Sequence, residues 1–177
     1  RIYAHKWLGY IGQKNLIKDL ASGPWILFID ADEEVSPELR DEILREFESG
    51  HNALCDGYEF PRMVHFMGRW IRHGEWYPDY KMRLFRKDRG ICAGQEPHDR
   101  TTVPGPVFRL NGHLYHYTYD SIGDQIKTLN DFAGITAQTM HKNGKRFRWT
   151  DLLFRPPFRF LKSYVFKGGA LDGMLGW

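Results

Sequence analysis

One apolar stretch that runs straight into a cluster of acids constrains the fold more than any other feature of this chain. Residues 25–29 (WILFI) are uninterruptedly apolar and have the length of a strand, and the acidic turn 30–34 (DADEE) follows at once. Such a run is typical of a strand covered on both faces, as in a parallel sheet. Ser36 and Pro37 then suit the N-cap and first turn of a helix that closes near Gly50. Strand, acidic turn and helix together predict part of an α/β sheet.

Composition narrows the possible classes of protein. The 177 residues suit one ordinary domain, and 42% hydrophobic with 27% charged residues indicate a folded chain. A net charge of +3 is too small by itself to indicate nucleic-acid binding. Two cysteines exclude a disulfide-dense scaffold and a four-thiolate zinc site. No apolar run approaches the roughly 20 residues that a membrane-spanning helix needs.

Asp30 and Asp32 are the first candidates for chemistry. Carboxylates at the carboxyl end of a buried strand lie where α/β folds bind ligands. If the backbone turns there, both can face one hard cation, and Mg²⁺ or Mn²⁺ favours such oxygen ligands together with substrate phosphates. The structural alternative is a polar turn in which Glu33 and Glu34 favour the N-terminus of the next helix. The spacing alone leaves both interpretations open.

Periodicity and helix-breaking residues predict the remaining elements. We expect helices over 13–22 and 121–143, and strands over 57–66, 80–86 and 107–117. Pro156 and Pro157 are expected to break any helix at that point. His113 and His116 are three residues apart in a predicted strand and so point to opposite faces, which argues against a structural zinc site.

The C-terminal part is basic and rich in aromatic residues. Between residues 142 and 167 there is one acid, Asp151, against eight basic residues: Lys142, Lys145, Arg146, Arg148, Arg155, Arg159, Lys162 and Lys167. An amphipathic stretch of this kind suits the surface of an anionic membrane, lying in the interface without crossing it. A solvated helix packed on the rest of the protein is the alternative.

Seven stretches carry a family resemblance: 13–15 (QKN), 25–33 (WILFIDADE), 68–78 (GRWIRHGEWYP), 81–86 (KMRLFR), 97–99 (PHD), 113–117 (HLYHY) and 167–173 (KGGALDG). In this order they resemble family 2 glycosyltransferases, above all the branch of lipopolysaccharide-core β-1,4-glucosyltransferases. The resemblance covers essentially the whole chain. It implies a GT-A fold, a nucleotide-sugar donor such as a UDP-hexose, a divalent metal ion, and transfer with inversion.

The resemblance also implies roles for particular residues. Asp32 would ligate the metal, which neutralises the departing diphosphate, and Asp30 would contact the donor ribose or the metal through water. The family usually has His-Glu where this chain has His98-Asp99. Asp99 is therefore the expected base for the acceptor hydroxyl, with His98 expected at the substrate and Glu96 as the alternative base. A loop carboxylate paired with a neighbouring arginine is the structural alternative.

Further candidates lie between these motifs. Lys81 and Arg83 are two positions apart in a predicted strand and so lie on the same face, where they are expected to contact the diphosphate. A solvated strand face has the same pattern and is the alternative. Trp76, with Trp70 and Tyr77, is a candidate for stacking on a sugar ring, and packing in the core is the alternative.

The organisation expected from the resemblance has two parts. Residues 1–120 are expected to form the GT-A catalytic core and residues 121–177 a helical, basic, amphipathic extension. The chain opens on Arg1 without a methionine. We therefore expect an excerpt of a longer protein in which the strands that hold the nucleotide base precede Arg1.

The function expected is glycosyl transfer to a cell-envelope glycan or to a lipid-linked acceptor such as the lipopolysaccharide core. The place of action would be the inner face of the cytoplasmic membrane. A haloacid-dehalogenase-type phosphatase, which also has Asp-x-Asp after a buried strand, is one alternative. A non-catalytic glycan-binding module is the other.

Overall fold

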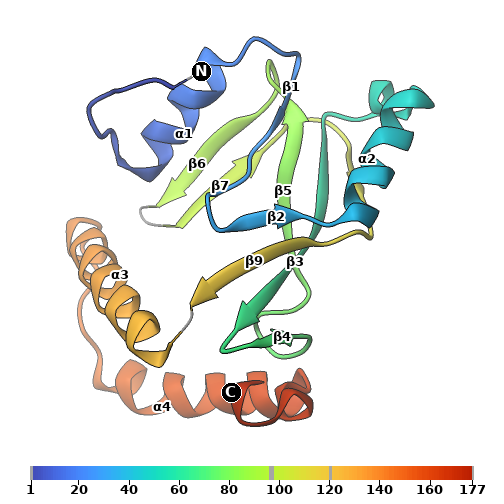
Figure 1. Ribbon diagram of the computed structural model, residues 1–177. Helices are drawn as coiled ribbons and strands as arrows, with labels where there is room; N and C mark the ends of the chain where they lie inside the picture. The colour runs from blue at the N-terminus through green and yellow to red at the C-terminus, as the bar shows by residue number, and fades with distance from the viewer. Residues whose placement is uncertain (1, 96–97, 120, 177) are drawn as a thin grey trace.

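A mixed seven-stranded sheet forms the centre of the protein (Figure 1). The computed structural model describes residues 2–95, 98–119 and 121–176. Along the main path of the sheet the strands are β1 (Trp25–Leu27), β5 (Asp79–Arg86), β3 (Gly57–Phe66), β9 (Leu114–Tyr119) and β2 (Glu33–Val35). Two short strands, β4 (Arg69–Ile71) and β8 (Val107–Arg109), also pair with β3. The predicted α/β sheet is confirmed, and it is mixed, because β8 and β9 run parallel to β3 whereas the other pairs are antiparallel.

The two faces of the sheet carry separate hydrophobic clusters. Neighbouring residues of β5 divide between them, because side chains alternate along a strand. Leu84 packs with Tyr58 and with Leu39 of α2 (Pro37–Glu48), whereas Phe85 packs with Ile26 and the residues around α1 (Gly9–Leu20). The two helices therefore cover opposite faces.

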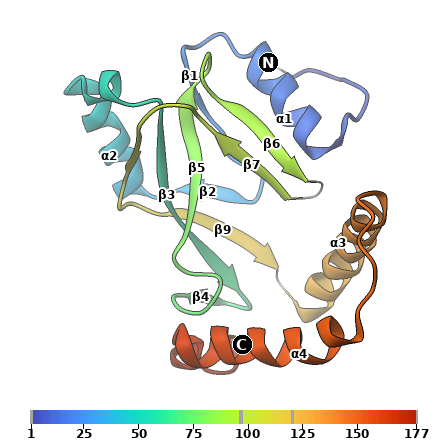
Figure 2. The same cartoon turned by 180° about the vertical axis from the view of Figure 1, so that it is seen from behind.

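A two-stranded hairpin lies beside α1, as both ribbon views show (Figures 1 and 2). It consists of β6 (Ile91–Gln95) and β7 (His98–Thr102). The side-chain amide of Asn15 on α1 donates to the carbonyl of Cys92 at 2.8 Å and accepts from the Cys92 N–H at 3.1 Å. This double hydrogen bond holds α1 in register with the hairpin.

Ser36 caps α2 as predicted. Its hydroxyl accepts from the Leu39 N–H at 3.1 Å and also from the His113 N–H at 3.2 Å. The second bond ties the chain just before β9 to the start of the helix. The predicted strand 107–117 is in fact two strands, β8 and β9. Residues 111–113 between them donate backbone hydrogen bonds to Glu42 and Ser36 at the first turns of α2.

The strand prediction for residues 25–29 was wrong in one respect. Burial alternates, with Ile26 and Phe28 buried and Leu27 and Ile29 exposed. Among the described strands β1 pairs only with β5, and it runs antiparallel to it. On the face toward α2 only Trp25 is packed, so the apolar run is covered mainly on one side.

The C-terminal part is helical. It comprises α3 (Ile122–Lys142), α4 (Trp149–Phe160), the π-helical turn η2 (Leu161–Phe166) and the 3-10 segment η3 (Gly169–Gly176); a further 3-10 turn, η1 (His51–Leu54), follows α2. Ser121 caps α3 where the sequence predicts it. The predicted break at Pro156 and Pro157 was wrong, because α4 runs through both. Proline lacks the N–H donor and its ring crowds the preceding turn, which weakens a helix. Its φ is nevertheless fixed near the helical value, so the backbone can stay helical.

Candidate active site

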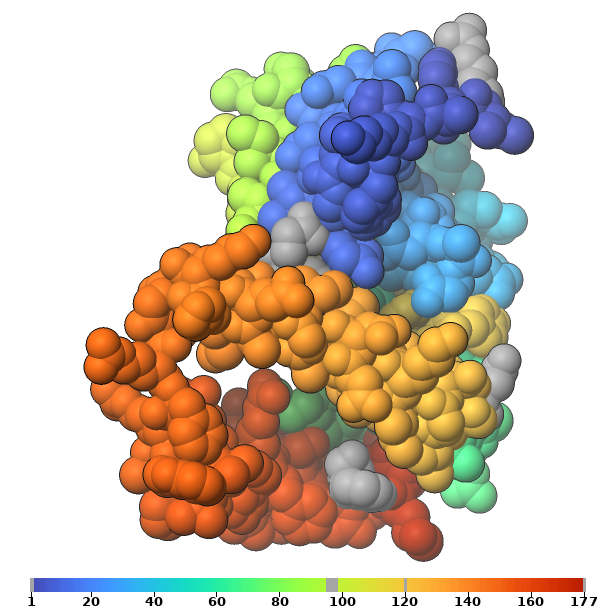
Figure 3. All heavy atoms as spheres, turned by 90° about the vertical axis from the view of Figure 1, so that its left-hand side faces the viewer, coloured from blue at the N-terminus to red at the C-terminus, as the bar shows by residue number. Residues whose placement is uncertain are grey.

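A cavity of about 1610 Å³ lies on the face of the sheet that carries α1 and the β6–β7 hairpin. Residues from α1, β3, β5, β7, α3 and α4 line it, and Figure 3 shows the molecule hollowed between α3 and the C-terminal segment below it. Five of the residues predicted from the sequence line this one cavity: Asp30, Trp76, Lys81, Arg83 and Asp99. Segments that are remote in the sequence therefore meet here.

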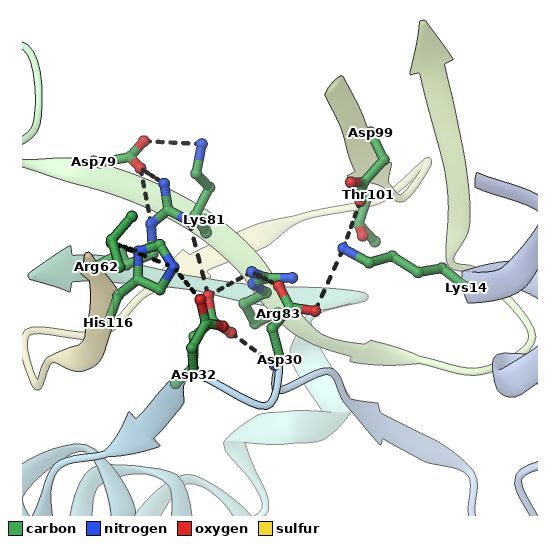
Figure 4. Close-up of polar contacts among 12 residues, drawn as sticks. Lys14, Asp30, Asp32, Arg62, Asp79, Lys81, Arg83, Asp99, Thr101 and His116 are labelled. Carbon is green, nitrogen blue, oxygen red and sulfur yellow. Dashed lines mark hydrogen bonds and ion pairs between the residues drawn. The ribbon is translucent and has the colours of Figure 1, made fainter. Parts of the chain in front are cut away.

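Arg83 on β5 holds the acidic turn in place. One of its terminal nitrogens donates to Asp30 at 2.7 Å and to Glu33 at 2.6 Å (Figure 4). The Glu33 side chain is fully buried, and its other oxygen accepts from the Asp30 N–H at 3.0 Å. Burial alone would lower the pKa of Arg83, but the two carboxylates outweigh it and raise the pKa. Arg83 is thus a permanent cation that fixes the direction of the turn.

Asp30 is ionised at neutral pH. Burial by itself would raise its pKa, but the charges of Arg83 and Lys14 and the hydrogen bond from Arg83 lower it below the usual 3.8. The Lys14 ammonium lies 3.8 Å from one Asp30 oxygen while Arg83 bonds the other. The carboxylate remains partly open to the cavity.

Lys14 links Asp30 to the expected base. Its ammonium, on α1, donates to Asp99 of β7 at 2.9 Å (Figure 4). Because Asn15 fixes α1 to the hairpin, as described above, the adjacent Lys14 meets Asp99 in a defined position. The two carboxylates expected at the donor and at the acceptor hydroxyl therefore share one cation.

Asp32 points to a different partner. Its carboxylate accepts from His116 Nε2 of β9 at 3.1 Å, while the Thr118 hydroxyl donates to His116 Nδ1 at 2.8 Å. Burial lowers the pKa of His116, and nearby Arg62 lowers it further against the opposing pull of Asp32. The imidazole is therefore neutral at pH 7. The Asp32 side chain is 49% exposed, so it can accept a further ligand.

Lys81 and Trp76 have different surroundings at the cavity wall. The Lys81 ammonium lies 3.0 Å from Asp79, which Arg62 also binds at 2.8 Å. The Lys81 side chain is 41% exposed and its charge remains accessible. Trp76 packs edge-on against Phe66, with ring centroids 5.4 Å apart, and its side chain is half-buried. It contributes to the core and to the cavity lining together.

Two predicted residues fall outside what the structure describes. Glu96 lies outside the described residues, and for His98 only the backbone in β7 is described. Their expected roles stay predictions.

Five residues that the sequence analysis did not assign to the site take part in it: Lys14, Glu33, Arg62, Asp79 and His116. Period-two alternation was a signal for Asp79, which shares a strand face with Lys81 and Arg83. Lys14 stands in the QKN motif without an assigned role. Nothing local to the sequence pairs His116 with Asp32, because the contact joins β9 to the turn before β2.

The chemistry of the donor set suits a divalent cation. Two carboxylates, with a neutral imidazole on one of them, are ligands that Mg²⁺ or Mn²⁺ accepts. Within the described residues no three His, Cys, Asp or Glu side chains converge on a common point. Asp30 lines the cavity and faces Arg83 and Lys14, whereas Asp32 is not among the cavity-lining residues and faces His116, which is.

Fold and site together define an α/β protein with a large cavity lined by carboxylates and basic side chains. The profile of Glycosyl transferase family 2 matches residues 1–102, which is more than half of the chain. The chain therefore belongs to this family. The resemblance inferred from the motifs is confirmed, and the phosphatase alternative is not supported.

Relatives named as glycosyltransferases match along all or nearly all of the chain. The lipopolysaccharide core biosynthesis glycosyltransferase LpsC of Rhizobium meliloti is 29% identical over 179 residues, covering 100% of this chain and 66% of its own length. Uncharacterized glycosyltransferases of Rickettsia typhi and Rickettsia felis are 29% and 30% identical and cover 100% and 99% of the chain. The chain spans 64% of the length of the Rickettsia typhi protein and 68% of the Rickettsia felis one. In the described part of the chain, no helix has both the length and the apolarity needed to cross a membrane.

Proposed function

We propose that this chain carries the catalytic site of an inverting glycosyltransferase. It moves a hexose from a nucleotide-sugar donor, with UDP as the expected nucleotide, to a cell-envelope glycan or a lipid-linked acceptor such as the lipopolysaccharide core. The observation that supports this most is the meeting of Asp30, Lys81 and Asp99 at one cavity, although 69 residues separate the first from the last. The name of the Rhizobium relative supports the choice of acceptor.

The donor end of the site lies at the acidic turn. Asp32, with Asp30 beside it, is the residue that would hold Mg²⁺ or Mn²⁺, and the cation supplies charge neutralisation for the diphosphate. Lys81 is accessible and acts on the same diphosphate as a point charge. Arg83 is already bonded to two carboxylates, so we assign it the positioning of Asp30.

The acceptor end lies at the hairpin. In the proposed step an acceptor hydroxyl oxygen attacks the anomeric carbon as the bond from that carbon to the diphosphate oxygen breaks. The hydroxyl proton passes to the Asp99 carboxylate, and attack from the side opposite the leaving group inverts the configuration. Lys14 holds Asp99 in position for this transfer. Trp76, at the cavity wall, offers its ring to a sugar.

The place of action that we propose is the inner face of the cytoplasmic membrane, where nucleotide-sugars and lipid-linked acceptors meet. Its support is the basic and aromatic character of residues 142–167.

The experiment is calorimetry on the full-length protein with UDP-hexoses, with and without Mn²⁺, beside a transfer assay on cell-envelope acceptor. Asp32 is chosen because it is half exposed and does not contact the buried Arg83. Asp32→Asn should weaken metal-dependent donor binding by about 10- to 100-fold. Asp99→Asn should bind donor normally but lower the transfer rate by roughly 10²- to 10⁴-fold.

The matched pair of variants separates the possible failures. Donor binding that ignores the metal and the Asp32 variant would refute the donor site. Full transfer by Asp99→Asn would refute the base. Binding of glycans without binding of any nucleotide-sugar would make the protein a glycan-binding module.

A further inference from the structure

The outer face of α4 is an apolar stripe that no described part of the chain covers. Phe154, Phe158 and Leu161 stand at positions i, i+4 and i+7, so they lie on one side of the helix. Their side chains are 67%, 64% and 49% exposed. Large apolar side chains held in water at regular spacing indicate a surface that binds something.

The opposite side of the same helix lines the cavity. Pro156, Phe160 and Ser163 are cavity residues, each two positions after a residue of the outer stripe. Two positions along a helix turn the side chain by about 200°, to the far side. The helix therefore lies between the cavity and whatever the outer stripe contacts, along the lower edge of the molecule in Figure 1.

The segment is fixed to the body of the protein, so this orientation is defined. Glu75, next to Trp76 of the cavity wall, forms ion pairs with Lys162 at 3.2 Å and Lys167 at 2.9 Å. Asp172 accepts from the backbone N–H groups of Arg72 and His73 at 2.8 and 2.7 Å. These contacts anchor η2 and η3 beside β4 and leave the outer stripe free to face outward.

The segment that carries the stripe is positive, because residues 148–167 hold five basic residues and one acid, Asp151. Arg155 is paired with Asp151, and Lys162 and Lys167 with Glu75, whereas within the described residues no carboxylate pairs with Arg148 at the start of α4. A symmetric contact between two copies would bring these cations together, which is unfavourable. An anionic lipid surface provides both the negative charge and the apolar layer that the stripe lacks.

We propose that the stripe Phe154, Phe158 and Leu161 inserts into the interface of an anionic membrane. Because the reverse side of α4 lines the cavity, this contact holds the cavity at the membrane surface, where an acceptor can enter while its lipid part stays in the bilayer. The acceptor class is therefore a glycan carried on a lipid. This last step depends on the proposed glycosyl transfer, whereas the membrane contact does not.

The test is flotation of the full-length protein with vesicles of phosphatidylcholine alone or with phosphatidylglycerol added, without donor or acceptor. Binding is expected only with phosphatidylglycerol and is expected to fall as salt is raised. Phe154→Ser with Phe158→Ser should lower the partition coefficient by about tenfold or more, since two apolar side chains leave the interface. The matched control is Leu54→Ser with Ile91→Ser, which removes two exposed apolar side chains elsewhere and should bind as the unaltered protein does.

Two outcomes would overturn the membrane contact. One is equal vesicle binding by the stripe variant and the control variant. The other is sedimentation that shows the unaltered protein and the control as dimers and the stripe variant as a monomer.

A second experiment compares sugar transfer to vesicle-bound acceptor with transfer to the same glycan freed of its lipid. The stripe variant should lose only the first activity, and loss of both would refute the orientation. No transfer to either acceptor by the unaltered protein would refute the proposed function and leave the vesicle result standing.

Discussion

Arg83 is a buried arginine whose ion pairs hold the acidic turn. The side chain of its partner Glu33 is fully buried as well. A buried carboxylate that loses its cation cannot be rehydrated without disrupting the packing around it. The turn that carries Asp30 and Asp32 therefore depends on a residue 50 positions further along the chain.

Replacing Arg83 with methionine is expected to lower the free energy of unfolding by about 3–5 kcal/mol, because the buried Glu33 carboxylate loses the cation 2.6 Å away and keeps the more distant Arg62, at 3.8 Å. Urea denaturation measures the loss. Lys81→Met on the same strand is the control and should cost within about 1 kcal/mol, since the Lys81–Asp79 pair is partly exposed and Asp79 keeps its pair with Arg62. Similar losses in the two variants would show that the buried pair is not what holds the turn.

Among the elements, the C-terminal helices contribute to the site through a small number of attachments. Glu75 is one of the polar attachments, because it pairs with Lys162 in η2 and with Lys167 directly after it. The hydrogen bond from Lys167 lowers the pKa of Glu75 the most, burial opposes it, and the hydrogen bond from Lys162 and the charges of both lysines lower it further. Its folded-state pKa therefore lies below the usual 4.5, and the attachment strengthens the fold where Glu75 is ionised.

The stabilisation from Glu75 should be complete above about pH 4.5 and should be lost as the pH falls through the lower folded-state pKa. Glu75→Gln should remove this pH-dependent part and cost about 0.5–1 kcal/mol at pH 7, the range of partly exposed ion pairs. Denaturation curves between pH 3 and 7 for the two proteins measure it. An identical pH dependence in both would show that the attachment does not rest on this charge.

At the scale of the whole molecule, the site exists only in the folded state. Lys14, Asp30, Lys81 and Asp99 come from four separate segments of the chain and meet at one cavity. A ligand that contacts several of them binds the native state and not the unfolded chain. Binding and global stability are therefore linked.

A UDP-hexose with Mn²⁺, at 100 times its dissociation constant, should raise the free energy of unfolding by about 2.7 kcal/mol. Chemical denaturation with and without ligand measures the increase. Without ligand, Asp32→Asn should have the same free energy of unfolding as the unaltered protein. With the same ligand at the same concentration, the free energy of unfolding of the variant should rise much less. An equal gain in the variant would place donor binding elsewhere.

Local patterns in the sequence determined most elements of the fold. The strand predicted over 57–66 is β3, and the helix predicted after Ser121 is α3. Ser36 caps α2 as its residue type and the following proline predict. Each of these depends on residues within one or two turns or on alternation along one strand, so the information is contained in neighbouring positions.

Only the tertiary structure decided which distant residues meet. The sequence offered Glu33 as favouring a helix N-terminus in one of two open interpretations, and in the structure it is the buried partner of Arg83. The Lys14–Asp99 pair joins residues 85 positions apart, and no periodicity within either segment indicates it. The one-sided covering of residues 25–29 likewise depends on what packs beside them. The sequence thus determined the elements, the family and the candidate acids, whereas strand pairing across the sheet decided the partner of each acid.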